Sequence, residues 1–223
     1  MTKSLLTALV MGAALAGCGG TPNVYYTLTA NSGQAAAAQA PAAQAPGLYT
    51  LGTVNVPAPV DDTMLVVRQS DDQLMKLAHD RWTAPLGKQV SNALAVALTQ
   101  QLGMPPLSSA QASGKQAPIT KFSVDIQRFD LVPGQFAALT AVWQIRPGAS
   151  TRASTPASTP ASTTSTTSNK SATSLTCYTE LRQSVEPGVA PLVKAQQRNI
   201  EQLAQAMSSV WQMGSWPAST RCQ

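Results

Sequence analysis

The residues of this chain with the most distinctive chemistry are its cysteines, and Cys18 stands in an unusual setting. It follows Leu15, Ala16 and Gly17 and closes a short apolar run that begins beside Lys3. A cation, an apolar stretch over residues 5–14 and small residues before a cleavage point are the parts of a secretory signal peptide. The pattern predicts that the chain is exported and that residues 1–17 are removed.

The four residues Leu15-Ala16-Gly17-Cys18 resemble the bacterial lipobox. The resemblance implies cleavage before Cys18, diacylglycerol on its thiol and acylation of the new amine. One myristoyl chain binds a membrane with K of only about 10⁴ M⁻¹, so a multiply acylated cysteine anchors far more firmly. The alternative is a transmembrane helix, which needs about twenty apolar residues, and here glycines and polar residues follow too soon. Gly19, in place of Asp, favours onward export to the outer membrane.

The other two thiols belong to Cys177 and Cys222. With Cys18 acylated they allow one intramolecular pairing, and in an oxidising envelope compartment we expect a disulfide between them. It would close a loop of about 44 residues and, on the chain-entropy model, stabilise the fold by about 4 kcal/mol. Two free thiols, or pairing between chains, are the alternatives.

Residue types that carry acid–base or metal chemistry are few. His79 is the one histidine, so no second imidazole can share a zinc site with the cysteines. Asp61-Asp62 and Asp71-Asp72 are adjacent pairs, whose side chains point to opposite faces of an extended segment; both pairs favour turns. There is no Gly-rich phosphate loop, no G-x-S-x-G and no S-x-x-K. We therefore expect no enzymatic activity, no metal and no cofactor.

The charge composition argues against nucleic-acid binding. Charged residues make up 11% of the 223 residues, against about 25% in ordinary soluble domains. The net charge is +5 and falls to +4 when the signal peptide, with Lys3, is removed. The cations are scattered singly along the chain and form no basic patch. Such a surface suits contact with another protein better than the steering of a charged substrate.

Two stretches have too few large apolar side chains to pack. Residues 29–47 are rich in Ala, Gln and Pro and are predicted to form a disordered tether, together with the lipidated N-terminus from residue 18. Residues 149–174 contain a doubled ASTP repeat followed by Ser and Thr. We interpret them as an expanded surface loop, since lengthening a loop costs only about 0.6 kcal/mol per doubling. A glycosylated stalk is the alternative.

The rest of the chain, residues 48–223, alternates between strand and helix patterns. Strands are predicted at residues 49–56, 64–69, 73–77, 119–131, 136–145 and 175–185. One helix is expected to begin near Thr83, as its N-cap, with Pro85 in its first turn, and to stop at Gly103; a second spans residues 191–212. The expected fold class is α/β: a single mixed, largely antiparallel sheet packed with two long amphipathic helices.

Four motifs occur in order along this part of the chain. They are Tyr25-Tyr26-Thr27-Leu28, then Pro57 with Val60-Asp61-Asp62, then Val66-Val67-Arg68, and finally Arg81-Trp82-Thr83-Ala84-Pro85-Leu86. The series resembles the PqiC/YmbA family of outer-membrane lipoproteins, which are auxiliary components of ABC-type and MCE-type lipid transport systems. The resemblance covers residues 18–28 and 48–212. Asp62 departs from the family pattern, which has an arginine there.

The resemblance implies a non-catalytic role on the periplasmic face of the outer membrane. A lipid-anchored module would dock a needle-forming MCE-domain protein, and through it an inner-membrane transporter component, to that membrane. The motif residues Tyr25, Tyr26, Leu28, Asp61, Arg68, Arg81, Trp82, Pro85 and Leu86 are the candidates for an interface. A ring-shaped homo-oligomer around the needle tip is compatible with this role.

Two other functions remain open at this point. A lipoprotein activator of a cell-wall synthase likewise combines a lipobox, a tether and a small α/β domain. A direct carrier would hold a hydrophobic ligand between the sheet and the helices, and it would need an apolar cavity there.

Overall fold

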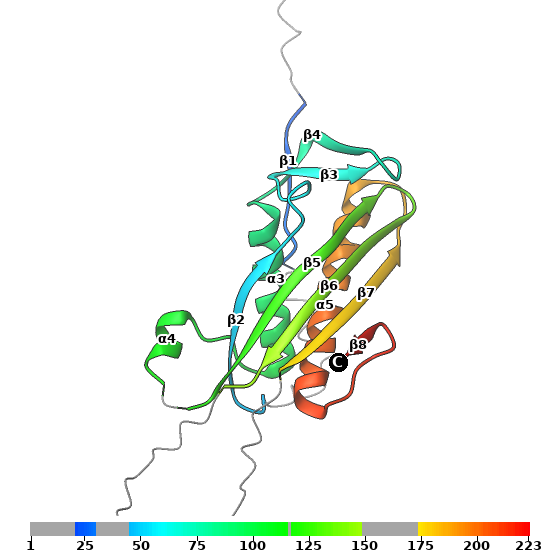
Figure 1. Cartoon of the computed structure of the whole chain (residues 1–223). Helices are drawn as coiled ribbons and strands as arrows, with labels where there is room; N and C mark the ends of the chain where they lie inside the picture. Colours follow the sequence, from blue (N-terminus) through cyan, green and yellow to red (C-terminus); the bar gives the residue numbers. More distant parts are fainter. Residues whose placement is uncertain (1–20, 30–44, 116, 149–173) are drawn as a thin grey trace, which may run out of the picture.

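The computed structural model describes residues 21–29, 45–115, 117–148 and 174–223. In this part of the chain two sheets and three helices form one α/β fold (Figure 1). The signal peptide, Cys18, Gly19, most of the 29–47 segment and all of the 149–174 segment except residue 174 lie outside the described residues, so the predictions for them stay predictions.

The larger sheet has five strands in the order β2-β5-β6-β7-β8. Their bounds are Leu48–Asn55 (β2), Ile119–Val132 (β5), Phe136–Arg146 (β6), Leu175–Ser184 (β7) and Thr220–Cys222 (β8). β2 runs parallel to β5, and the other neighbours are antiparallel. The β5–β6 turn uses Gly134 at φ +67°, a left-handed conformation that glycine adopts without a steric penalty. The predicted strands 119–131 and 136–145 thus form an antiparallel hairpin.

A second, smaller sheet holds β1 (Val24–Tyr26), β4 (Leu74–Trp82) and β3 (Met64–Arg68), in that order. The expectation of a single sheet was wrong. β3 and β4 pair with each other across the turn that Asp71-Asp72 favours, and the free edge of β4 is taken by β1, which runs parallel to it. The chain reverses direction at residues 57–61, where Val60 N–H donates to Pro57 O at 3.0 Å, and this turn carries β3 away from β2. Figure 1 shows the small sheet across the upper end of the large one.

Two long helices, α3 (Leu86–Leu102) and α5 (Val189–Met213), lie behind the large sheet in Figure 1 and cover one of its faces. α3 begins two residues later than expected, because the residue before a proline is disfavoured in the helical region and Ala84 precedes Pro85. Pro85 is thus the N-cap residue rather than part of the first turn, and Thr83 is not the cap. A short helix that the sequence did not predict, α4 (Ser109–Ser113), follows.

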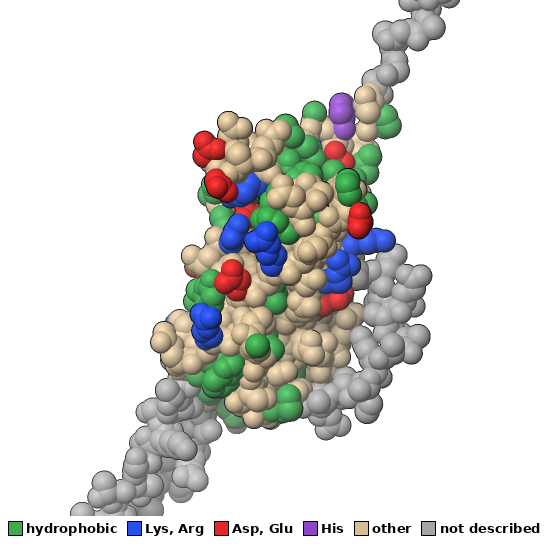
Figure 2. Space-filling view, turned by 90° about the vertical axis from the view of Figure 1, so that its right-hand side faces the viewer, with side chains coloured by type: hydrophobic (Ala, Val, Ile, Leu, Met, Phe, Trp, Pro, Cys, Tyr) green, Lys and Arg blue, Asp and Glu red, His purple; other side chains and the backbone are tan. Residues whose placement is uncertain are grey.

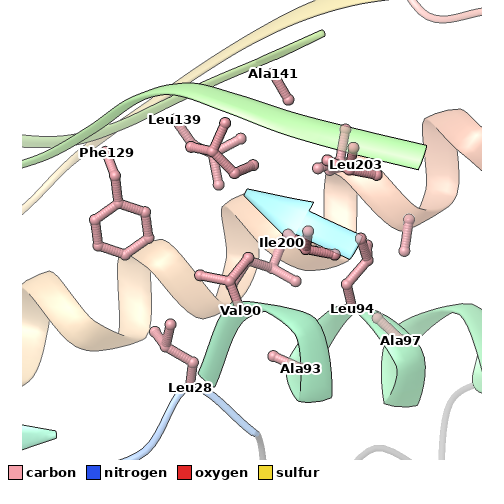
Figure 3. Packing of buried hydrophobic residues seen from close by; sticks show 14 of the residues in the cluster. Leu28, Val90, Ala93, Leu94, Ala97, Phe129, Leu139, Ala141, Ile200 and Leu203 are labelled. Carbon is pink, nitrogen blue, oxygen red and sulfur yellow. The ribbon is translucent and has the colours of Figure 1, made fainter. Parts of the chain in front are cut away.

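The core lies between these helices and the inner face of the large sheet. Figure 3 shows part of it: Val90, Ala93, Leu94 and Ala97 of α3 and Ile200 and Leu203 of α5 meet Phe129, Leu139 and Ala141 of the sheet. The opposite face of the sheet carries the exposed side chains of Lys121, Tyr178 and Glu180 and is uncovered in the described structure.

The disulfide between Cys177 and Cys222 is present. These residues are direct partners in the β7–β8 pairing, so the bond fixes the last strand to the sheet edge. Beside it, Thr179 and Thr220 share a buried hydrogen bond at 2.8 Å, and Trp143 Nε1 donates to Thr179 Oγ1 at 2.9 Å. β8 has only three residues, so the covalent link and this small network hold it in place.

Removing the disulfide should destabilise the domain. We expect the double variant Cys177→Ser/Cys222→Ser to lose about 2–4 kcal/mol of unfolding free energy, because the loop closed in the unfolded chain is released. Urea denaturation of the mature chain, followed by tryptophan fluorescence, measures this loss. The parent protein treated with reductant is the matched control and should unfold like the variant. Two free thiols in the denatured, non-reduced parent would contradict the pairing.

Candidate functional site

The predicted lipid anchor connects to the fold through β1. Val24 pairs with Asp80 and Tyr26 with Trp82 in the parallel register of β1 and β4, and Thr83 N–H donates to Tyr26 O at 3.0 Å. Residues 24–29 therefore belong to the folded domain, which begins earlier than the boundary expected at residue 48. Only residues 19–23 separate Cys18 from β1. The segment expected to act as the tether mostly follows β1 and does not precede it.

Gln89 of α3 holds the chain just after β1. Its side chain is buried, and Oε1 accepts hydrogen bonds from Leu28 N–H and from Thr27 Oγ1, both at 3.2 Å. Its Nε2 donates to Thr83 Oγ1. From α5, Gln197 Nε2 donates to Thr27 O at 3.0 Å. Two helices and the small sheet thus converge on this stretch of chain.

Leu28 completes the attachment from the apolar side. It is 1% exposed, and Figure 3 shows it beside Val90 and Ala93 of α3. The space that Leu28 lines with Ala93, Ala97 and Ile200 has a volume of only about 10 Å³. A cavity of this volume holds about one water molecule. The groove between the helices is therefore filled by Leu28 and its neighbours, and it has no room for an acyl chain.

The two tyrosines of the first motif have different environments. Tyr26 is partly buried, and its hydroxyl donates to Asp80 Oδ1 at 3.0 Å. Burial, followed by the interaction with this carboxylate, raises the pKa of Tyr26 above its usual value of 10.0. Tyr25, in contrast, is 60% exposed. Tyr26 therefore has a structural role, whereas the exposed side chain of Tyr25 is available for contact with another molecule.

The motif at residues 81–86 also contains both buried and accessible side chains. Trp82 is 2% exposed, and its ring meets Phe129 of β5 edge-on with centroids 6.5 Å apart; Leu86 is 1% exposed. Arg81 is half-buried and its guanidinium lies 3.5 Å from Ala78 O, whereas Pro85 is exposed. Trp82 and Leu86 thus join the small sheet and α3 to the core. As buried side chains they do not offer a surface to a partner.

Asp61 caps α3 from a distance in the chain. Pro85, the N-cap residue, provides no side-chain hydrogen bond, and Gly87 N–H donates instead to Asp61 Oδ1 at 2.9 Å. The carboxylate thereby satisfies one of the unpaired N–H groups of the first turn and lies at the positive end of the helix dipole. The second motif is therefore a helix cap supplied by the turn after β2.

Asp62, the residue that departs from the family pattern, forms an ion pair. Its Oδ2 lies 2.6 Å from Lys76 Nζ, and its Oδ1 accepts from Met64 N–H at 3.0 Å. These hydrogen bonds, with that of Lys76 first, lower the pKa of Asp62 from 3.8 to about 2. The pair joins the start of β3 to β4 on the surface.

Arg68 joins the two sheets. Its Nε donates to Asp130 Oδ1 at 3.0 Å, and Arg128 Nε donates to the other carboxylate oxygen. The side chain of Asp130, in β5, is only 3% exposed, so both arginines compensate a buried charge. Arg68 Nη1 also donates to Asp71 O at 2.9 Å and so holds the β3–β4 turn.

The described residues offer no recognisable catalytic or metal-binding constellation. His79 lies exposed in β4, inside a strand rather than between a strand and a helix as expected. Over the ranges 21–29, 45–115, 117–148 and 174–223 there is no group of three side chains able to hold a metal ion. None of the described helices is long and apolar enough to span a membrane. The motif residues instead attach the N-terminal segment to a packed core.

Comparison with known proteins assigns the class. A family described as "ABC-type transport auxiliary lipoprotein component" matches residues 26–208, from Tyr26 of the first motif almost to the end of α5. The chain therefore belongs to this family of PqiC/YmbA-type lipoproteins, as its motifs predicted. No curated protein matches the chain.

Two solved structures are similar to this chain. A crystal structure of an uncharacterised protein superposes with a TM-score of 0.57 at 16% identity, over 84% of this chain and 97% of that one. A Xanthomonas campestris protein of the family DUF330 gives a TM-score of 0.48 at 12% identity, over 87% and 94%. At such low identity the first of these supports the fold alone.

Gln89 provides a test of how the N-terminal segment is held. Gln89→Ala leaves the buried N–H of Leu28 without its acceptor, which should cost about 1–3 kcal/mol. We expect faster hydrogen exchange at residues 25–29, measured by mass spectrometry on the mature chain. Asn92→Ala removes an exposed amide from the same helix and is the matched control. Equal protection in both variants would show that Gln89 does not hold the segment.

Asp62 should contribute a pH-dependent part of the stability. A carboxylate whose pKa is lowered in the folded state stabilises the fold above its unfolded pKa, and the contribution is lost as the pH falls through the folded pKa. For Asp62 this window runs from 3.8 down to about 2. We expect Lys76→Met to move the titration of Asp62, followed by NMR, back toward 3.8. An unchanged titration would exclude the ion pair with Lys76 as the main cause.

Proposed function

We propose that this protein is acylated at Cys18, held on the periplasmic face of the outer membrane, and serves as a non-catalytic docking subunit of an MCE-type intermembrane lipid transport system. The observation that carries the proposal is the match of residues 26–208 to the auxiliary lipoprotein family of ABC-type transport. Membership in this family supports a transport-associated lipoprotein. We add the proposal that its partner is an MCE needle protein, which in turn contacts the inner-membrane transporter component.

The position of the lipobox supports the anchoring part of this proposal. Cys18 stands six residues before β1, and β1 is the edge strand of the small sheet. An acylated Cys18 would thus fix a folded domain to the membrane through a short connection. Gly19, the residue after the acylated cysteine, favours export to the outer membrane over retention at the inner membrane.

The packing of the core argues against a direct lipid carrier. Such a carrier needs space for an acyl chain between the helices and the sheet, whereas the space beside Leu28 measures about 10 Å³. The larger depressions on the surface are open, and one of about 390 Å³ lies over the disulfide and Arg221. A docking subunit needs only an exposed surface, so the solid core is compatible with that role.

Photo-crosslinking in cells tests the proposed partner. A benzophenone amino acid at Tyr178, on the uncovered sheet face, or at Trp216, after α5, replaces an aromatic residue that is 38% or 46% exposed. We expect mass spectrometry to identify an MCE-domain protein among the adducts. We also expect Cys18→Ala to abolish both the adduct and the incorporation of labelled palmitate, since an unanchored protein leaves the outer membrane.

Other adducts would redirect the assignment. Capture of a cell-wall synthase, without any MCE-domain protein, would favour the activator of cell-wall synthesis that the sequence left open. Capture of only unrelated envelope proteins from both positions would overturn the docking role. Palmitate incorporation that persists in Cys18→Ala would overturn the acylation site independently of the partner.

A further inference from the structure

The exposed apolar side chains of this protein are concentrated at one end. Seven large hydrophobic residues are exposed in the described structure, and four of them lie on the small sheet. Val24 (46%) and Tyr25 (60%) lie on β1 beside the carboxyl end of β4, and Leu74 (40%) and Met75 (38%) lie at the start of β4, about 20 Å away along that strand. Figure 2 shows hydrophobic side chains at this upper end, beside the histidine. We call these four residues the apolar end. Two pairs of large exposed apolar side chains on one small sheet favour contact with a partner or a membrane at this end of the domain.

The chain outside the fold brings this end close to the predicted anchor. Val24 is the sixth residue after Cys18. Six residues of fully extended chain span at most about 21 Å. Because β1 is hydrogen-bonded to β4 and Leu28 is buried, the connection cannot lengthen without unfolding this edge of the domain. β1 therefore has to stay within that distance of the lipid that carries Cys18.

We propose that the apolar end is the membrane-contact surface of the domain, on which Val24, Tyr25, Leu74 and Met75 rest against a phospholipid surface. The inference rests on acylation of Cys18, which is part of the proposed function, and not on the identity of the transport partner. Tyrosine suits this position, since its ring is apolar and its hydroxyl remains at the level of the headgroups.

The charges around the apolar end select the kind of lipid. Asp71 and Asp72 lie in the turn directly before Leu74, and Lys76 is already paired with Asp62. On β4, exposed His79 and half-buried Asp80 and Arg81 follow, with Tyr26 donating to Asp80. Among the residues that the structure describes, this end has no cluster of unpaired cations that would attract an anionic membrane. The surface therefore fits zwitterionic headgroups, and contact weakens as the fraction of anionic lipid increases.

Fluorescence from two matched sites tests the proposal. Met75→Cys places a thiol at the apolar end, and Met213→Cys places one at the end of α5, at the opposite end of the molecule in Figure 1. With Cys18 acylated and Cys177 bonded to Cys222, the introduced cysteine is the one available to an NBD label. The labelled, acylated full-length protein is reconstituted into phosphatidylcholine vesicles, with and without brominated acyl chains.

We expect the label at position 75 to shift to the blue and to be quenched by brominated lipid, and the label at position 213 to show neither effect. Replacing part of the phosphatidylcholine with phosphatidylglycerol should reduce the quenching at position 75. Equal emission at the two positions would overturn the proposal. So would a blue shift at position 75 that grows with protein density and ignores brominated lipid, because that result indicates contact between two copies.

The outcome is separable from that of the docking role, since the vesicles contain no transport partner. Quenching at position 75 supports the membrane surface even if no MCE-domain protein is ever crosslinked. An intact mass without acyl groups would remove the premise and overturn this proposal, while the family assignment would stand.

Discussion

The attachment of residues 24–28 to the rest of the fold is the constraint on which this architecture depends. A backbone N–H buried without an acceptor is costly, and Gln89 supplies that acceptor to Leu28 while its other end holds Thr83. The same stretch adds β1 to the edge of β4 and fills the space between α3 and α5 with Leu28. One short segment therefore completes the small sheet and the packing between the two helices.

Buried polar groups also join the layers. The carboxylate of Asp130 accepts hydrogen bonds from Arg68 of β3 and from Arg128 of its own strand. Gln196 of α5 donates to the backbone oxygens of Asp130 and Ala138. Asn199 donates to Gln196, while its own Oδ1 has no partner. Polar contacts of this kind add little net stability but penalise alternative arrangements, because each shift leaves a charge or an amide unpaired. The Arg68–Asp130 contact fixes the small sheet on the large one, and the amide of Gln196 fixes α5 on the large sheet.

The strands and helices were largely predictable from the sequence, whereas their assembly was not. Alternation located β2, β3, β5, β6 and β7, and counting thiols located the disulfide. Local patterns do not state which edges pair, so the second sheet was missed, as were the three-residue strands β1 and β8. The Asp61 cap acts across 26 residues of chain. Gln89 did carry a signal, since it is a polar residue at a helical position that faces the core.

The family motifs acquire a different meaning once their burial is known. Leu28, Trp82 and Leu86 are in the core, Asp61 caps a helix and Arg68 binds Asp130, so these residues secure the connection between anchor and domain rather than form an interface. A domain on a long flexible tether would lose orientational freedom each time it bound a partner. A domain whose first strand begins six residues after the predicted anchor has a shorter reach, so less freedom is left to lose in a later contact. Under the proposed function, such a short connection suits a docking subunit better than a mobile carrier.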